Sequence, residues 1–133
     1  MDDSATRIML VDDHEPTRLE ISGLISQEDD MVVVGDVETG EEAVSMASEL
    51  EPSLIVMDLF MPGINGLEAT RQILAENEYV RVLALSNYYD KQIESEIRRC
   101  GAKGFVNKSH AFEELLPAIR KVAAGGEYFS TND

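Results

Sequence analysis

The sequence predicts an α/β fold in which helices cover both faces of a parallel sheet. Two observations lead to this fold class. Short runs of aliphatic and β-branched residues recur about every 25 residues along the chain. Stretches with apolar residues at helical spacing separate these runs. Strict alternation of five strands with five helices is typical of one doubly wound sheet whose strands are all parallel.

The five predicted strands are short and almost continuously apolar, which suits strands that are buried on both faces. They are residues 7–11, 31–34, 54–57, 80–85 and 104–106. No internal repeat, low-complexity segment or linker-like composition divides the chain between them. We therefore expect a single domain.

The predicted helices have recognisable starts. Pro16 suits the first turn of the first helix, and Thr39 followed by Glu42 suits a capping box at the start of the second. Asn65 and Gly66 suit the opening of the third helix. Pro117 lies within the fifth helical stretch, where its missing N–H predicts a kink or a late start. The helical spacing is carried by Leu19, Leu24 and Ile25; Ala43, Val44, Ala47 and Leu50; Leu67, Ile73 and Leu74; Ile93, Ile97 and Cys100; and Leu115, Ile119 and Val122.

Acidic residues outnumber basic ones, and the excess lies in the first half of the chain. The 133 residues include 26 Asp and Glu and 11 Lys and Arg, which gives a net charge of −15. Residues 1–66 hold 16 of the acids and 2 of the bases, so the second half is nearly neutral. The charge repels phosphate backbones and anionic lipids. Direct binding of nucleic acid or of a membrane surface by this domain is therefore disfavoured.

Three further features restrict the class of protein to which the chain can belong. The chain has no apolar run of roughly 18 residues and no signal-peptide pattern at its start, so we expect a cytoplasmic protein. Cys100 is the one cysteine, and we expect it to be a small buried apolar residue. His14 and His110 are not paired at a metal-ligand spacing, and we expect loop positions for both.

Polar side chains follow four of the predicted strands. Asp12 and Asp13 come after the first strand, and Asp58 comes after the third. Ser86 follows the fourth strand, and Lys108 lies just beyond the fifth. In open α/β sheets the binding site lies beyond the carboxyl ends of the strands. We therefore expect these five residues to converge on one edge of the sheet.

The expected cluster has the chemistry of a metal-assisted phosphoryl-transfer site. Three carboxylates at one edge repel one another unless a cation lies among them. Oxygen ligands without His or Cys favour Mg²⁺. A hydroxyl and an ammonium can bind the remaining phosphoryl oxygens. Asp58, which follows the central strand, is the best placed nucleophile for forming an acyl phosphate.

Four segments in this order and spacing resemble the response-regulator receiver domain of two-component signalling. Residues 58–68, DLFMPGINGLE, are similar to the segment around the phosphorylated aspartate of that family. Residues 11–14 resemble its acidic pair, residues 85–87 its hydroxyl position, and residues 101–108 the approach to its lysine. The resemblance covers roughly residues 6–125.

The resemblance implies a flavodoxin-like (βα)5 fold with the strand order 2-1-3-4-5. A receiver domain would occupy residues 1–125, and residues 126–133 would begin a linker or C-terminal tail. Residues 118–130 look like the end of a NarL/FixJ-type receiver, where a linker to a helix-turn-helix DNA-binding domain begins. The implied output is transcription through such a domain, which is absent from these 133 residues.

The resemblance also implies the partners of the domain. A histidine kinase or phosphotransfer protein would donate the phosphoryl group, and homodimer formation on phosphorylation is a further expectation. The domain would act as a phosphoacceptor rather than as an enzyme. We expect its nearly neutral second half, including Arg98 and Arg99, to face the partner.

Carried over position by position, the resemblance assigns roles at the site. Asp58 would be the phosphoacceptor and Asp13 a direct Mg²⁺ ligand. Asp12 would bind Mg²⁺ directly or through water, and the backbone carbonyl of Phe60 would complete the protein ligands. Lys108 would pair with a phosphoryl oxygen.

Two further residues would report phosphorylation. Ser86 would hydrogen-bond another phosphoryl oxygen, and Phe105 would move inward when Ser86 turns toward the phosphoryl group. Phe105 lacks a phenol, so only its ring packing can report the change. Asn87 stands where the family usually has a smaller residue, which predicts narrower access to Asp58 or an altered phosphoryl lifetime.

Other functions remain open on the sequence. A receiver-like scaffold that acts by protein contacts without phosphorylation is the main alternative. An aspartate-nucleophile phosphohydrolase would usually have a second carboxylate at the position of Phe60. A flavodoxin-type flavin site would need a Ser/Thr/Gly-rich loop where Asp12 and Asp13 stand.

Overall fold

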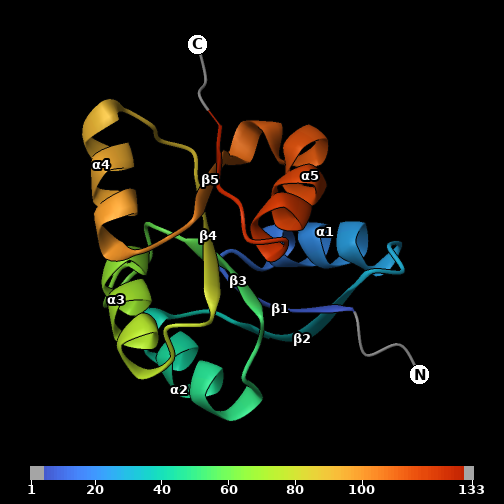
Figure 1. Cartoon of the computed structure of the whole chain (residues 1–133), viewed down its shortest axis with the longest axis horizontal. Coiled ribbons are helices and arrows are strands. Elements are labelled where there is room, and N and C mark those ends of the chain that lie inside the picture. The colour runs from blue at the N-terminus through green and yellow to red at the C-terminus, as the bar shows by residue number, and fades with distance from the viewer. Residues whose placement is uncertain (1–4, 131–133) are drawn as a thin grey trace.

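A parallel β-sheet forms the centre of the molecule, with helices on both of its faces (Figure 1). The computed structural model describes residues 5–130. Within them the strand order is β2-β1-β3-β4-β5-β6, and every pairing is parallel. The predicted fold class and the order 2-1-3-4-5 are confirmed. The strands are β1 (Thr6–Val11), β2 (Met31–Val37), β3 (Leu54–Asp58), β4 (Arg81–Ser86), β5 (Gly104–Asn107) and β6 (Tyr128–Phe129).

Five α-helices connect the strands, as the alternation predicts. They are α1 (Glu15–Ser26), α2 (Gly40–Leu50), α3 (Gly66–Glu76), α4 (Lys91–Cys100) and α5 (Ala111–Ala123), and a 3₁₀ turn (Lys108–His110) precedes α5. Helices α1 and α5 cover one face of the sheet, and α2, α3 and α4 cover the other (Figure 1). Among residues 5–130, no helix has the length and apolar character that a membrane span requires.

Alternate residues of the central strands build the two core layers, because successive side chains of a strand point to opposite faces. Met9, Val11, Ile55, Met57, Val82, Ala84 and Phe105 pack toward α2, α3 and α4. Ile8, Leu10, Leu54, Val56, Leu83, Leu85 and Val106 pack toward α1 and α5. Cys100 is buried at the end of α4, as expected. The central strands are therefore held on both faces, which fixes the position of the residues at their ends.

Helix caps follow the predicted pattern with one difference. The Thr39 side chain accepts a hydrogen bond of 3.0 Å from the Glu42 N–H, and Asn65 caps α3 by accepting from Glu68 N–H at 3.0 Å. Pro16 is the second residue of α1. In a capping box the Glu42 carboxylate would accept a hydrogen bond from the Thr39 N–H. Here it accepts instead from the N–H of Glu38, one residue earlier.

Two helices differ in detail from the predictions. Helix α5 begins directly after the 3₁₀ turn and continues through Pro117, so the late start, one of the two alternatives predicted, is wrong. Burial of its apolar row, which includes Leu115 and Ile119, outweighs the one lost backbone donor. In α1, Leu19 is 65% exposed rather than part of the buried row. The residue that takes a place in that row is Arg18.

The short strand β6 was not predicted, since it lies in the segment expected to begin a linker or tail. Tyr128 N–H donates to the Lys103 carbonyl at 3.1 Å, and Ser130 N–H donates to the Phe105 carbonyl at 2.8 Å. A cation–π contact of 3.7 Å between the Arg98 guanidinium and the Phe129 ring ties β6 to α4. The chain after α5 therefore pairs with the sheet at least as far as Ser130.

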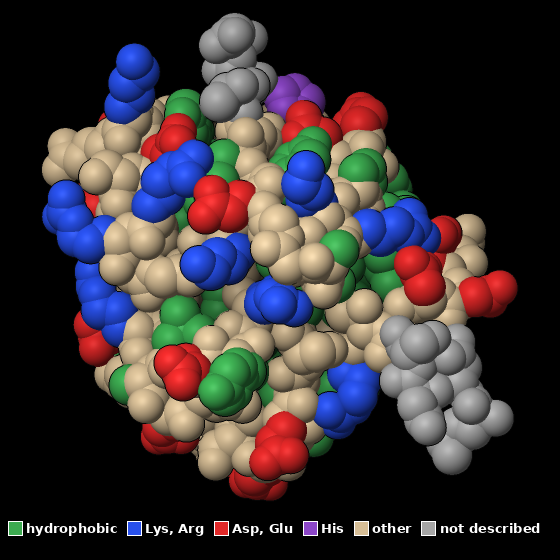
Figure 2. All heavy atoms as spheres, viewed as in Figure 1, with side chains coloured by type: hydrophobic (Ala, Val, Ile, Leu, Met, Phe, Trp, Pro, Cys, Tyr) green, Lys and Arg blue, Asp and Glu red, His purple; other side chains and the backbone are tan. Residues whose placement is uncertain are grey.

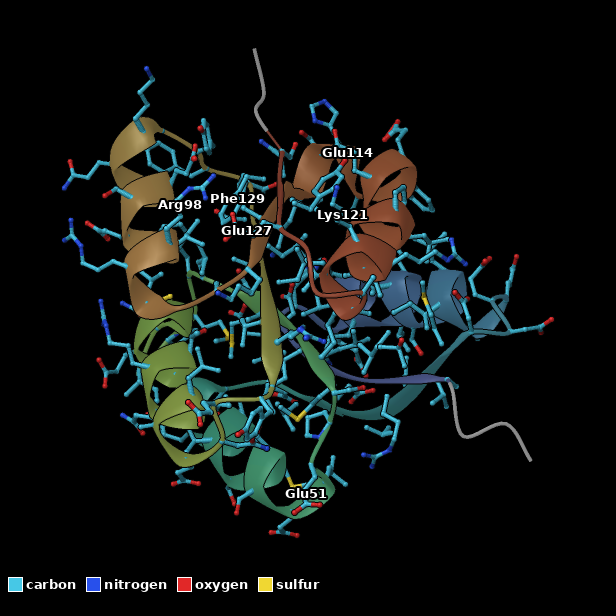
Figure 3. The ribbon with its side chains drawn as sticks, viewed as in Figure 1. Glu51, Arg98, Glu114, Lys121, Glu127 and Phe129 are labelled. Atoms are coloured by element: carbon cyan, nitrogen blue, oxygen red, sulfur yellow. The ribbon has the colours of Figure 1, made fainter. Side chains whose placement is uncertain are left out.

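The Arg98 side chain contacts other residues of the domain, and Figure 3 shows it beside Glu127 and Phe129. Besides Phe129, it pairs with Glu94 of α4 at 3.0 Å and with Glu127 at 3.1 Å. Arg99, its neighbour, is exposed. The basic side chains of the second half are visible around α4 in Figure 2. Of the two arginines predicted to face a partner, Arg98 is the one with extensive internal contacts.

Candidate functional site

Three carboxylates converge at the carboxyl ends of β1 and β3, which are neighbours in the sheet. Oxygen atoms of Asp12, Asp13 and Asp58 all lie within 4.8 Å of one another. Asp12 and Asp58 are buried, whereas Asp13 is exposed. Their convergence follows from the parallel sheet, because the strand ends meet at one edge.

Lys108 reaches the same cluster from the turn after β5. Its Nζ atom lies 2.9 Å from Asp12 Oδ2 and 3.4 Å from Asp58 Oδ2. Burial alone would lower the pKa of this ammonium, but its close contact with the Asp12 carboxylate and the charge of Asp58 outweigh burial and raise the pKa. Lys108 is therefore a fixed positive charge between two buried carboxylates.

The Asp58 carboxyl group holds its proton more tightly than an ordinary aspartate. Burial raises its pKa from 3.8 to about 6, and the negative charge of Asp12 adds to this rise. The charge of Lys108 and the N–H of Phe60, which lies 3.3 Å from Asp58 Oδ1, act in the opposite direction. The ionised form predominates at neutral pH, although burial and the nearby charge of Asp12 disfavour it.

The donor set suits a hard divalent cation. Its protein ligands would be carboxylate oxygens, which Mg²⁺ prefers, whereas zinc sites commonly include His or Cys. Asp12 Oδ2 is buried and accepts no hydrogen bond of regular geometry, although Lys108 Nζ lies nearby. A buried carboxylate oxygen with spare coordination capacity and an exposed Asp13 beside it fit a cation that keeps some of its water.

The loop after Asp58 is held close to the start of α3. Gly66 N–H donates to the Leu59 carbonyl at 2.9 Å. A Cβ atom at Gly66 would lie 2.2 Å from the Asp58 carbonyl oxygen, so only glycine permits this approach. Phe60, the next residue of the loop, exposes its ring and meets the Tyr88 ring edge to face at 6.5 Å.

Ser86 is at the same edge, but its hydroxyl is engaged with the backbone of its own loop. It donates to the Tyr88 carbonyl at 3.1 Å and accepts from the Tyr88 N–H at 2.9 Å. The structure therefore places Ser86 near the cluster without joining it to Asp58 or Lys108. Asn87 is exposed and borders, with Lys108, a groove between α1 and α5.

Phe105 is completely buried in β5. Its ring stacks on Tyr89 with centroids 5.4 Å apart and an angle of 27° between the rings. The Tyr89 hydroxyl donates to the Glu94 carboxylate of α4. A phenol is thus present beside Phe105, although it comes from the loop after β4.

Sequence reasoning missed the supporting contacts of the acidic pair. Arg18 donates from Nη1 to the Asp12 carbonyl at 2.6 Å, and His14 N–H donates to Asp12 Oδ1 at 2.9 Å. His14 precedes α1, and its ring contacts Thr17. His110 ends the 3₁₀ turn. An arginine in an otherwise apolar helix row was the available signal for Arg18.

The sheet, the acidic cluster and the lysine define the receiver class of signalling domains. The family model of the response regulator receiver domain matches residues 8–120, and the chain belongs to this family. The relatives place it with NarL/FixJ-type receivers. It is 38% identical over 124 residues to the response regulator GacA of Pseudomonas protegens and 34% identical over 128 residues to the transcriptional regulatory protein DegU of Brevibacillus brevis.

These matches span 93% and 96% of the chain but 58% and 54% of the two relatives, so the chain is a little over half as long as they are. Solved structures agree with the fold. A LuxR-family two-component response regulator from Aurantimonas sp. superposes with a TM-score of 0.90 at 35% identity, covering 94% of this chain and 89% of that one. The response regulator domain of Thermotoga maritima CheB gives 0.84 at 33% identity, with 90% and 97% covered.

Proposed function

We propose that the domain accepts a phosphoryl group on Asp58 from a histidine kinase or phosphotransfer protein. The observation that carries this proposal is the arrangement around Asp58, a buried carboxylate with oxygen atoms of Asp12 and Asp13 within 4.8 Å and Lys108 Nζ at 3.4 Å. An enzyme with turnover has no comparable support at this site, because the position of a second general acid or base is taken by Phe60.

In the transfer step an Asp58 oxygen attacks the phosphorus of a phosphohistidine. A P–O bond forms as the P–N bond breaks, and the imidazole nitrogen leaves with the electron pair. A pKa of about 6 keeps Asp58 mostly ionised, and therefore nucleophilic, at neutral pH. Lys108 is placed to exchange its contact with Asp58 for a phosphoryl oxygen.

Asp12, Asp13, Asp58 and the backbone carbonyl of Phe60 would hold Mg²⁺. The bound ion supplies positive charge that offsets the phosphoryl oxygens during transfer. Lys108 contributes further positive charge at the same edge, 3.4 Å from Asp58 Oδ2, where it would offset the charge of a phosphoryl oxygen.

Ser86 and Phe105 would carry the response. To reach a phosphoryl oxygen, Ser86 must give up its two hydrogen bonds to Tyr88, and the loop between β4 and α4 then has to shift. Tyr89 lies in that loop and stacks on Phe105, so a shift of the loop changes the packing of a fully buried ring. The structural effect of an added phosphoryl charge of about −2 would thereby extend to the surface of α4.

We further propose a transcriptional output in a longer protein. One relative, DegU, is a transcriptional regulatory protein, and the matches cover only 58% of GacA and 54% of DegU. The acidic domain itself is unsuited to contact DNA. A helix-turn-helix domain that follows residues 126–133 would contact DNA, and phosphorylation of the receiver would promote a homodimer. The protein would act in the cytoplasm.

The acceptor assignment is tested by incubation with Mg²⁺ and a small acyl phosphate, followed by intact-mass measurement. We expect one added phosphoryl group on the unaltered protein and on Asp29→Asn, which removes an exposed carboxylate just before β2, at the end of the sheet opposite the site. Asp58→Asn should remain unmodified. Labelling of Asp58→Asn equal to that of the parent would overturn the assignment, and failure to bind Mg²⁺ with beryllofluoride would favour an unphosphorylated scaffold.

A further inference from the structure

Arg18 is a buried cation behind the acidic cluster. Its side chain is 9% exposed and lies in the row of α1 that faces the sheet, together with Ile21 and Ile25. A guanidinium taken out of water destabilises a fold unless hydrogen bonds and opposite charges compensate for the lost hydration. The contacts of this side chain therefore indicate what its burial achieves.

The shortest polar contact of Arg18 is to the backbone of a candidate metal ligand. Its Nη1 donates a hydrogen bond of 2.6 Å to the Asp12 carbonyl oxygen. That carbonyl belongs to the peptide group that joins Asp12 to Asp13, and a peptide group is planar. Holding the carbonyl therefore restrains the plane from which the Asp13 side chain projects.

The other polar groups of Asp12 have partners of their own. The Asp12 N–H donates to the Val37 carbonyl at 3.1 Å, and Oδ1 accepts from the His14 N–H at 2.9 Å. Oδ2 lies 2.9 Å from Lys108 Nζ. The Asp12 carbonyl is the group on which Arg18 acts, so its hydrogen bond completes the restraint of the residue.

Two carboxylates near the end of β2 offset the charge of Arg18. Asp36 Oδ1 lies 3.8 Å from Nε, and Glu38 Oε2 lies 3.9 Å from Nη2. Both carboxylates are more than half exposed, so each ion pair contributes little on its own. The short buried hydrogen bond to Asp12 remains the contact with the greatest effect on geometry.

We propose that Arg18 is a positioning residue for the divalent-cation site, and that it orients the Asp12–Asp13 peptide group so that both carboxylates face one cation. This inference rests on the proposed function, because it requires that Asp12, Asp13 and Asp58 hold Mg²⁺. A buried positive charge also repels Mg²⁺. These two effects change the Mg²⁺ affinity in opposite directions, so the direction in which the Kd changes when Arg18 is replaced shows which effect is larger.

The experiment measures the Kd of Mg²⁺ from ¹H–¹⁵N shifts of the site amides during MgCl₂ titration. Arg18→Lys keeps the charge but loses the planar donor geometry, and Arg18→Gln removes the charge. We expect both to raise the Kd about tenfold, the lower end of the effect typical when a group that orients a metal ligand is lost. Arg7→Lys and Arg7→Gln are matched controls, because Arg7 donates to the Glu51 carbonyl at 2.6 Å from the opposite end of β1.

The outcomes separate this inference from the proposed function. Unaltered protein that does not bind Mg²⁺ would contradict the metal site itself. Binding by the parent with an unchanged Kd in Arg18→Lys would overturn the positioning role alone, as would tighter binding by Arg18→Gln. Unchanged Kd values for the Arg7 variants are expected, and an equal rise there would also refute the inference, since it would indicate a general loss of structure.

A measurement on the unaltered chain covers the case in which the Arg18 variants do not fold. The Arg18 guanidinium ¹⁵N signals should shift during the Mg²⁺ titration with the same Kd as the amide of Asp13. The signals of Arg7 should remain constant. Arg18 signals that do not move while the Asp13 amide does would refute the positioning role.

Discussion

Removing the charge of Asp58 should stabilise the metal-free protein at neutral pH. The pKa of this carboxyl rises from 3.8 to about 6 on folding, mainly through burial and next through the charge of Asp12. The folded state therefore binds the proton more tightly than the unfolded chain does. Stability falls as the pH rises from about 4 to about 6, and the full penalty is present above the folded pKa.

The size of the penalty follows from the same values. Each tenfold change in proton affinity corresponds to about 1.4 kcal/mol, so the rise from 3.8 to about 6 corresponds to about 3 kcal/mol. The Asp58 side chain is 4% exposed, so solvent screening reduces this little. Asn has nearly the shape of the neutral acid. We therefore expect Asp58→Asn to raise the free energy of unfolding by about 2 to 3 kcal/mol.

Urea unfolding in the presence of a chelator, followed by far-UV circular dichroism, measures this gain. At about pH 7.5 the midpoint of Asp58→Asn should lie well above that of the parent, and at about pH 4 the two should nearly coincide. The exposed control Asp29→Asn should change stability by less than about 0.5 kcal/mol at either pH. A gain that is absent at neutral pH, or that is the same at both pH values, would refute the electrostatic account of the site.

Three other perturbations have defined outcomes. Gly66→Ala should destabilise the protein by about 1–3 kcal/mol in urea unfolding, because its Cβ would lie 2.2 Å from the Asp58 carbonyl; an unchanged midpoint would contradict the close approach. Arg98→Gln should speed amide exchange at Tyr128 about fivefold through the loss of its ion pairs and ring contact, whereas Arg99→Gln should not; equal exchange in both would argue against the tie between α4 and β6. Mg²⁺ at about 10 mM should raise the thermal midpoint of the parent, and a chelator should reverse the gain; a midpoint insensitive to both would count against the metal site.

The sequence alone was enough to predict the parallel sheet and the convergence of the polar residues at the ends of its strands. Runs of buried strand residues are recognisable in a parallel sheet because both faces are apolar, and the polar residue that ends each run is then placed by topology. Asp12 and Asp58 are brought together in this way from positions far apart in the chain. The receiver family could be recognised for the same reason, since its motifs stand at those strand ends.

The remaining features depend on side-chain choices that no periodicity encodes. The Ser86 hydroxyl can bond its own loop or face Asp58, and only the structure places it on Tyr88. A strand of two residues such as β6 is too short for a pattern to indicate it. In α1, Arg18 is buried and Leu19 is exposed. This was missed because an apolar residue is ordinarily the better candidate for burial.

The pairing of β6 determines where the chain leaves the domain. Because β6 runs parallel to β5, its carboxyl end points to the same edge as Asp58 and Lys108. It also covers the N–H and C=O groups of β5 that would otherwise form an open edge for pairing with another chain. The chain direction at Ser130, the last residue that the structure describes, is therefore toward the edge of the sheet at which a phosphoryl group would be added.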